Sequence, residues 1–234
     1  MAHQLNEFKA QIDRLVSDGM EQEEALYKVL KETIIASQNI RFEGDGYSDE
    51  WKDEAARRGL TNICHVPEAI MKFNAPQSRS VLIGEKIFNE NELNCRIEVE
   101  LEKFTKKVQI ESRVLGDLAI NHIVPTAVIY QNRLLENLRG LKEIFSTEEY
   151  EEMTADRKDL VREIQRRILS IKKAVHDMTE ARKVANHLGS QVEKAFSYEE
   201  KVRPYLEEIR EHIDSLELEI DDEIWPLPKY RELL

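Results

Sequence analysis

The sequence predicts a mainly α-helical protein, with an antiparallel bundle of about four long helices preceded by a helical hairpin and an irregular connector. Apolar residues recur at steps of three and four over long stretches, which is the period of a helix that buries one face. Glycine and proline are scarce, with eight and six of 234 residues, as is typical of helix-rich globules. Long helices joined by short loops pack antiparallel with crossing angles of about 20°.

The first two predicted helices form a hairpin. Gly19 ends the first helix, because a glycine just after the last periodic residue is a common helix terminator. The second helix follows almost at once, and its apolar face is expected to pack on the first. The apolar positions of the two helices are Leu5, Phe8, Ile12, Leu15 and Val16, and then Ala25, Leu26, Val29, Leu30, Thr33 and Ile34.

An irregular connector with structure of its own is expected between Asn39 and about Ser80. It contains one clear short helix, SDEWKDEAARRG, for which Ser48 is the predicted N-cap and Gly59 the predicted stop. We therefore divide the chain into residues 1–80, the hairpin and connector, and residues 81–234, the bundle with its tail.

A long helical pattern begins at Asn89, which with Glu92 makes a cap-like start, and runs toward Phe145. Pro125 should kink this helix or divide it in two, because proline lacks the amide donor and crowds the preceding turn. Glu111 fills one position of the apolar stripe. The stripe comprises Leu93, Ile97, Leu101, Phe104, Val108, Leu115 and Leu118.

Two capping boxes predict the starts of the remaining helices: Ser146 with Glu149, and Ser190 with Glu193. Pro204 indicates a break near Arg203 in the last of them. The stripe of the first helix is Leu160, Ile164, Ile168, Ile171, Val175, Met178 and Ala185, and that of the last is Val192, Phe196, Leu206, Ile209, Ile213, Leu216 and Ile220.

The tail EIWPLPKYRELL cannot be helical through its two prolines, yet it is rich in apolar residues. Such a tail should dock either on its own bundle or on a neighbouring subunit. The candidate docking residues are Trp225, Leu227, Tyr230 and Leu233.

Charge and composition exclude several classes of protein. The net charge of −12 repels a phosphate backbone and gives no counterion-release term, so no nucleic-acid partner is expected. Apolar runs are only a few residues long, far short of the ~20 needed to cross a bilayer. Cys64 and Cys95 lack any C-x-x-C context, which favours a reducing cytoplasm without a disulfide.

The stretch RFEGDGYSDEW, residues 41–51, is the candidate ligand or interface loop. It lacks the third glycine of a dinucleotide fingerprint and the Gly-Lys-Ser/Thr of a P-loop. Read as a calcium loop, it would place an arginine at a ligand position. The favoured interpretation is a tight turn with positive φ at one or both glycines and three aromatic anchors, Phe42, Tyr47 and Trp51. The candidate residues are Arg41, Gly44, Asp45, Gly46, Tyr47 and Trp51.

No catalytic and no metal site is expected from the residues alone. The Glu-x-x-His pairs of a di-metal bundle are missing, and Cys64 and His65 are neighbours without an orienting motif. Glu111 and His122 fall on or beside an apolar stripe, where an unpaired charge would be expensive. A buried structural pair, with Arg113 or Arg133 as candidate partner, is favoured over a ligand site.

Four long segments of the sequence resemble one protein family. VLKETIIASQNIRFEGDGYSDEWKDEAARRGLTNICHVPEAI resembles the segment that closes the catalytic domain of bacterial type III glutamine synthetases. VQIESRVLGDLAINHIVPTAVIYQNRLLENL, DMTEARKVANH and IDDEIWPLPKYRELL resemble the C-terminal helical extension of the same enzymes. The resemblance covers nearly the whole chain, in the right order, and implies that residues 1 to about 80 close a catalytic domain.

The resemblance implies a parent glutamate–ammonia ligase of glutamine biosynthesis and nitrogen metabolism. Such an enzyme joins ammonia to glutamate with ATP, holds magnesium or manganese with glutamates, and assembles as two stacked hexameric rings. The motifs of its metal and nucleotide sites do not occur between Met1 and Leu234. No catalytic residue or cofactor is therefore carried over to this chain, which is expected to be inactive alone.

Two functional hypotheses follow. The first is a C-terminal helical fragment that turns over no substrate and serves subunit and ring assembly, with the rest of the enzyme and further copies as partners. The alternative is a regulatory or partner-binding module that acts on the enzyme through residues 41–51 or the bundle surface.

Overall fold

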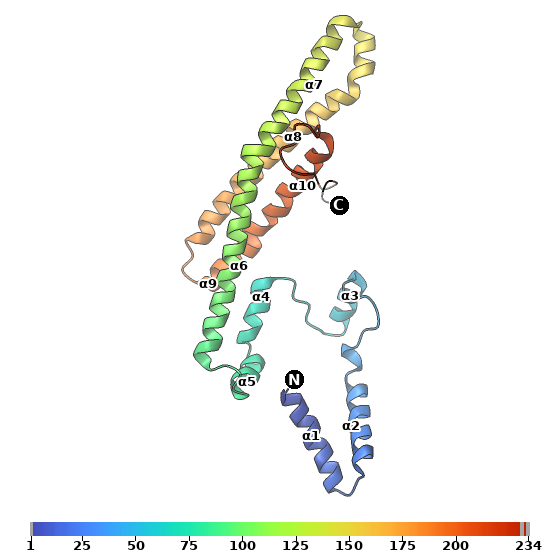
Figure 1. The fold of residues 1–234 in the computed structure, drawn as a ribbon, viewed down its shortest axis with the longest axis vertical. Coiled ribbons are helices and arrows are strands. Elements are labelled where there is room, and N and C mark those ends of the chain that lie inside the picture. Colours follow the sequence, from blue (N-terminus) through green and yellow to red (C-terminus); the bar gives the residue numbers. More distant parts are fainter. Residues whose placement is uncertain (1, 230–231, 233–234) are drawn as a thin grey trace. The chain divides into compact units, whose positions relative to one another are not determined.

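The computed structural model describes residues 2–229 and 232, and all regular structure among them is helical (Figure 1). The mainly α prediction is confirmed. The chain divides into two compact units, Met1–Ile97 and Glu98–Leu234. The boundary lies inside helix α6 (Glu90–Leu118), further along the chain than the predicted boundary at residue 80. Arg79 joins α5 (Pro76–Gly84) to the start of α6, donating to Glu90 at 2.6 Å and Asn94 at 2.9 Å.

The first unit opens with the predicted hairpin of α1 (Ala2–Ser17) and α2 (Gln22–Ala36). Gly19 ends α1 in the left-handed region, with φ of 98°. Ala25 and Val29 of α2 are buried, but Leu26, Leu30 and Ile34 stay 44%, 44% and 52% exposed. The apolar stripe of α2 is therefore wider than the surface that α1 covers.

Short helices make up the rest of the first unit, in agreement with the predicted irregular connector. Ser48 caps α3 as predicted, since its Oγ accepts the amide of Trp51 at 3.2 Å, and Gly59 ends that helix with φ of 71°. The helices before α6 are η1 (Gln38–Ile40), α3 (Asp49–Arg57), α4 (Val66–Met71), η2 (Lys72–Asn74) and α5.

Long helices form the second unit. After α6 come η3 (Ala119–Ile123), α7 (Val124–Ile144), α8 (Thr147–Asn186), α9 (Gln191–Ser197), η4 (Tyr198–Val202) and α10 (Arg203–Glu219). Figure 1 shows α7 running up to a short turn and α8 returning antiparallel to it, with α10 alongside α8. None of the described helices is long and apolar enough to cross a bilayer.

Both predicted proline breaks occur as π-helical turns. Pro125 and Pro204 each sit in the first turn of an α-helix, and a five-residue π-helical turn, η3 or η4, precedes each of them. A π-helical turn adds a residue to the helix and shifts the following side chains around its axis. The rod of α6, η3 and α7 therefore continues while its buried face changes phase.

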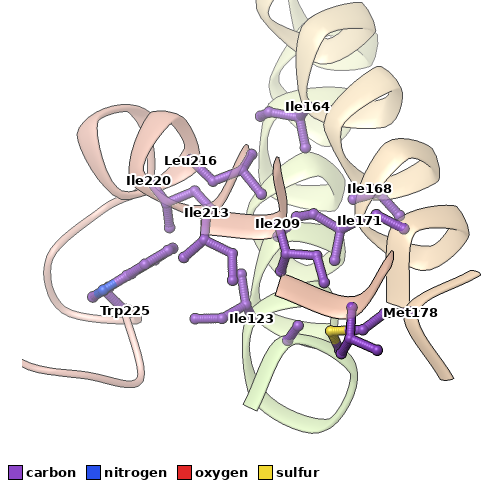
Figure 2. Packing of buried hydrophobic residues seen from close by; sticks show 14 of the residues in the cluster. Ile123, Ile164, Ile168, Ile171, Met178, Ile209, Ile213, Leu216, Ile220 and Trp225 are labelled. Atoms are coloured by element: carbon purple, nitrogen blue, oxygen red, sulfur yellow. The ribbon is translucent and has the colours of Figure 1, made fainter. Parts of the chain in front are cut away.

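The predicted caps are confirmed. Asn89 Oδ1 accepts the Glu92 amide at 2.9 Å, and Ser146 and Glu149 complete a reciprocal capping box. The predicted stripe of α8 is buried in the core of the second unit (Figure 2). That core comprises Val108, Ala119, Ile123, Ala127, Ile164, Ile168, Ile171, Ala174, Met178, Ala185, Tyr198, Val202, Ile209, Ile213, Leu216, Ile220 and Trp225.

Candidate functional site

The loop at residues 41–51 is held from inside by an arginine and an aromatic pair. The rings of Phe42 and Trp51 lie 4.5 Å apart between centroids, and the Arg58 guanidinium lies 5.9 Å from the Trp51 ring. Arg58 Nη1 also donates to the carbonyl of Arg41 at 2.6 Å and to that of Asn39 at 3.2 Å. The loop is therefore closed by the side chain of Arg58, the C-cap residue of α3.

The predicted positive φ in this loop is wrong. Among the described residues, the glycines with positive φ are Gly19 and Gly59. Asp45 builds the turn instead, because its Oδ1 accepts the Tyr47 amide at 2.9 Å and its carbonyl accepts the Ser48 amide at 3.1 Å. An aspartate side chain that bonds two residues ahead shapes a turn without the left-handed region.

Gly44 is needed for space rather than for its backbone angle. A Cβ placed on Gly44 would lie 2.6 Å from the Phe42 ring, whereas one on Gly46 would meet nothing within 4 Å. Gly44→Ala should therefore displace Phe42 from Trp51. We expect a shifted Trp51 emission maximum, recorded in a Trp225→Phe background, and faster trypsin cleavage at Arg41. Gly46→Ala is the matched control and should change neither. Equal behaviour of both variants would contradict the packing role of Gly44.

Tyr47 is not the anchor that the sequence predicts. It is 95% exposed, while Trp51 is half-buried. The Asp45 turn places Tyr47 at the tip of the loop, and the Phe42–Trp51 contact closes the loop without it. The structure therefore brings Arg41, Trp51 and Gly44 together and presents Tyr47 outward.

Glu54 of α3 orients the arginine that closes the loop. Its carboxylate accepts hydrogen bonds from Arg57 Nε at 2.6 Å and from Arg58. These hydrogen bonds, and the positive charges behind them, lower the pKa of Glu54 from 4.5 to about 2. The roles of Glu54 and Arg58 were not predicted, although an arginine three or four residues after a glutamate on a helix is a recognisable pairing signal.

The loop should loosen in acid because of Glu54. A carboxylate whose folded-state pKa is lowered stabilises the fold above its unfolded pKa. Its contribution should therefore be complete above about pH 4.5 and be lost as the pH falls toward about 2. We expect Trp51 emission, again in the Trp225→Phe background, to shift across this interval. Glu54→Gln should lack that transition, and a transition unchanged in Glu54→Gln would contradict the assignment.

The C-terminal tail docks on its own bundle. Trp225 is 7% exposed and belongs to the core, and Leu227 packs against that core. Figure 2 shows the Trp225 ring beside Ile213 and Ile220. Of the two docking alternatives, the structure shows the intramolecular one for these residues. Tyr230 and Leu233 lie outside the described residues.

Lys229 secures the tail. Its side chain is 6% exposed, and its Nζ donates to the carbonyls of Glu217 and Ile220 at 2.6 and 2.7 Å and contacts Asp222 at 2.6 Å. A cation at the end of a helix satisfies free carbonyls and complements the helix dipole. The role of Lys229 was not predicted, because its partners Glu217 and Ile220, in the last turn of α10 and just after it, lie twelve and nine positions earlier in the chain.

The predicted burial of Glu111 and His122 is wrong, since both are exposed. Glu111 Oε1 lies 3.9 Å from Lys107, which is an ordinary surface pair. Ser112, with no exposed area, takes the stripe position assigned to Glu111. Ile123, at the end of the π-helical turn η3, belongs to the core next to the exposed His122.

The described residues do not fit a metal ion. Nowhere in residues 2–229 and 232 do three or more His, Cys, Asp or Glu side chains form a group able to hold one. Cys64 and Cys95 are free and exposed.

Comparison with known proteins gives one consistent family. The family described as "Glutamine synthetase C-terminal domain" matches residues 25–142, which include the 41–51 loop and most of α7. A "Glutamine synthetase" of Bacteroides fragilis is 73% identical over 234 residues, which are 100% of this chain and 32% of that protein.

Two further relatives are more distant. A "Type-3 glutamine synthetase" of Dictyostelium discoideum is 27% identical over 90% of this chain and 29% of its own length. A "Glutamine synthetase" of Butyrivibrio fibrisolvens is 28% identical over 92% of this chain and 30% of its own length. The chain thus spans about a third of the length of the curated relatives it matches. It belongs to the glutamine synthetase family, in the part described as its C-terminal domain.

Proposed function

We propose that this chain is the C-terminal helical domain of a type III glutamine synthetase, and that it supplies assembly contacts rather than turnover. The likeness to a "Type-3 glutamine synthetase" and the span of about a third of each relative support the assignment. Its partners are then the rest of the enzyme and further copies of it. The parent reaction is the ATP-dependent ligation of ammonia to glutamate in the cytoplasm, with the metal and nucleotide held outside this domain.

The exposed apolar row of α2 carries this proposal. Leu26, Leu30 and Ile34 stand four residues apart, so they share one side of the helix. They are 44%, 44% and 52% exposed, and Tyr27 beside them is 68% exposed. A contiguous apolar surface of this kind marks an interaction site. Because the chain spans only about a third of its relatives, we infer that the remaining part of the enzyme covers this apolar row.

Binding in trans tests this assignment. The chain is titrated onto the immobilised part of the Bacteroides fragilis relative that it does not match, and we expect saturable binding. Leu26→Glu with Ile34→Glu should weaken this binding at least about tenfold, since each tenfold step needs only ~1.4 kcal/mol. The matched control is Leu169→Glu with Val184→Glu, two side chains of α8 that are each 59% exposed.

The outcome separates the alternatives cleanly. Binding that is weakened by the α2 substitutions and kept by the α8 substitutions supports the proposal. Absence of binding, or equal binding by the two double variants, contradicts it. Helix content and melting of all variants should match those of the unmodified chain, since the substituted positions are exposed.

We propose the same parent assembly that the resemblance implies, a homo-oligomer of two stacked hexameric rings. The net charge of −12 and the described helices support a partner that is neither nucleic acid nor membrane. Mass measurement of the full-length relative with and without its last third tests this point. The mass of the assembly divided by the mass of one subunit gives the number of subunits. The same number of subunits with and without the last third would contradict a role of the domain in ring assembly.

A regulatory role for the 41–51 loop is the second candidate function. The exposure of the Tyr47 side chain to solvent favours this role. The loop is closed by Arg58 and the Phe42–Trp51 pair, yet Tyr47 at its tip is 95% exposed. Titration calorimetry with ATP, glutamine and 2-oxoglutarate is the test. Heat of binding that is lost in Tyr47→Ala supports this role. If none of the three compounds gives heat of binding, the regulatory role is contradicted and the loop has a structural role.

A further inference from the structure

Helix α6 carries two apolar faces on opposite sides. Leu101 and Val108 are buried, at 1% and 3% exposed, and Val108 belongs to the core of the second unit. Val99, Ile110 and Val114 are 42%, 61% and 52% exposed. At 3.6 residues per turn these exposed residues fall about 180° from the buried ones. A helix that is apolar on both sides is expected to be covered on both sides.

The exposed face of the second-unit part of α6 combines apolar and basic side chains. We define the outer row of α6 as Val99, Lys103, Lys106, Ile110 and Val114. The residues on this side of the helix are Val99, Glu102, Lys103, Lys106, Lys107, Ile110 and Glu111, with three lysines against two glutamates. Lys103 contacts Glu100 at 2.8 Å, an exposed pair that contributes little and can exchange partners.

Helix α10 presents the opposite charge on its own outward side. Ile209, Ile213 and Leu216 are buried in the core. The outer row of α10, about 180° away, comprises Glu207, Glu211, Asp214 and Leu218. The charged residues on this side of the helix are Glu207, Glu208, Arg210, Glu211 and Asp214, four carboxylates against one arginine. Leu218 at the end of the row is 85% exposed.

The two outer rows match in spacing as well as in charge. Both advance by steps of four, three and four, from Val99 to Ile110 and from Glu207 to Leu218. Laid against each other, they place Lys103 and Lys106 opposite Glu211 and Asp214. In either direction of pairing Leu218 meets an apolar residue, Val99 or Ile110. Each row faces away from the core that both helices share, so the two rows cannot meet within one molecule.

We propose that the outer row of α6 binds the outer row of α10 of a second copy of this chain. The inference deepens the proposed assembly role by naming two complementary surfaces. Because the two surfaces differ, the contact is head-to-tail, and such contacts generate rings when the rotation closes and open chains when it does not. Opposite charges also select the register and speed association at low salt.

Charge reversal in both rows tests the contact. One variant carries Lys103→Glu and Lys106→Glu, and the other carries Glu211→Lys and Asp214→Lys. Sedimentation velocity at low ionic strength should show the unmodified chain in assemblies larger than the 27.4 kDa monomer, with less assembly at high salt. Each variant alone should sediment as a monomer. An equimolar mixture should assemble again, because acidic α6 rows then meet basic α10 rows.

Matched controls change the same charge elsewhere. Lys172→Glu with Lys173→Glu, and Glu152→Lys with Asp156→Lys, alter exposed positions of α8 and should leave assembly unchanged. Melting curves show whether each variant is folded. A monomeric unmodified chain, assembly retained by either row variant alone, or a mixture of folded variants that stays monomeric overturns the proposal. Binding through the α2 row is measured separately with the rest of the enzyme, so failure of one does not imply failure of the other.

Discussion

Replacing Trp225 with alanine should lower the free energy of unfolding of the Glu98–Leu234 unit by about 3–5 kcal/mol. Trp225 is 7% exposed and belongs to the core together with Ile220 and Ile213. Truncation would remove a large apolar ring and leave a cavity where the tail crosses the bundle. Lys229 Nζ, 5.8 Å from the centre of the same ring, would also lose a neighbour. Denaturant unfolding monitored by circular dichroism measures the change.

Two comparisons isolate the packing role of Trp225. Its indole nitrogen is buried without a hydrogen-bond partner, so Trp225→Phe removes no hydrogen bond and should cost less than half as much as Trp225→Ala. Leu218→Ala, at a position that is 85% exposed, should change stability by less than about 0.5 kcal/mol. A loss below about 1 kcal/mol for Trp225→Ala would mean that the tail is not part of this core.

Replacing Tyr198 with alanine should cost a similar amount, about 3–5 kcal/mol. Tyr198 opens the π-helical turn η4, has no exposed area and belongs to the same core. Its hydroxyl donates to Asn186 Oδ1 at 2.8 Å, and Gln109 of α6 donates to the same oxygen at 3.2 Å. The residue therefore connects the turn to α8 and α6, and burial raises the pKa of its hydroxyl.

Tyr198→Phe separates the ring from the hydroxyl. It keeps the packing and removes one neutral hydrogen bond, so the expected loss is about 1 kcal/mol. Asn186 Oδ1 keeps its bond from Gln109 in this variant. Thermal and denaturant unfolding of both variants provide the measurement. Equal losses for Tyr198→Phe and Tyr198→Ala would contradict the assignment of most of the effect to packing.

Much of the fold follows from local signals in the sequence. Helix starts at Asn89 and Ser146 depend on side chains three residues apart, and the stripe of α8 depends on a period that the helix preserves along its length. Gly19 and Gly59 end helices in the left-handed region as a glycine allows. Such features need no knowledge of distant parts of the chain, which is why they were predicted correctly.

Features that depend on distant contacts or on a change of helical phase were missed. A stripe extrapolated from Leu101 in alternating steps of three and four reaches Glu111 and His122, whereas the structure buries Ser112 and Ile123, because such a 3.5-residue repeat drifts against a helix of 3.6 residues per turn. Lys229 finds its carbonyls only because the tail folds back over α10. Arg58 closes the loop from 17 residues away, and such a contact leaves no local signal in the sequence. The two glycines predict a bend that depends on positive φ, but the bend is shaped by the side chain of Asp45 and Gly44 leaves room for the Phe42 ring.

The claim that the chain supplies contacts rather than turnover is tested most directly by measuring glutamine formation. The isolated chain is incubated with ATP, glutamate, ammonia and magnesium, and the full-length Bacteroides fragilis relative at equal molarity is the positive control. We expect glutamine from the relative and none above the buffer blank from the chain. Glutamine that increases in proportion to the concentration of the chain would contradict the claim.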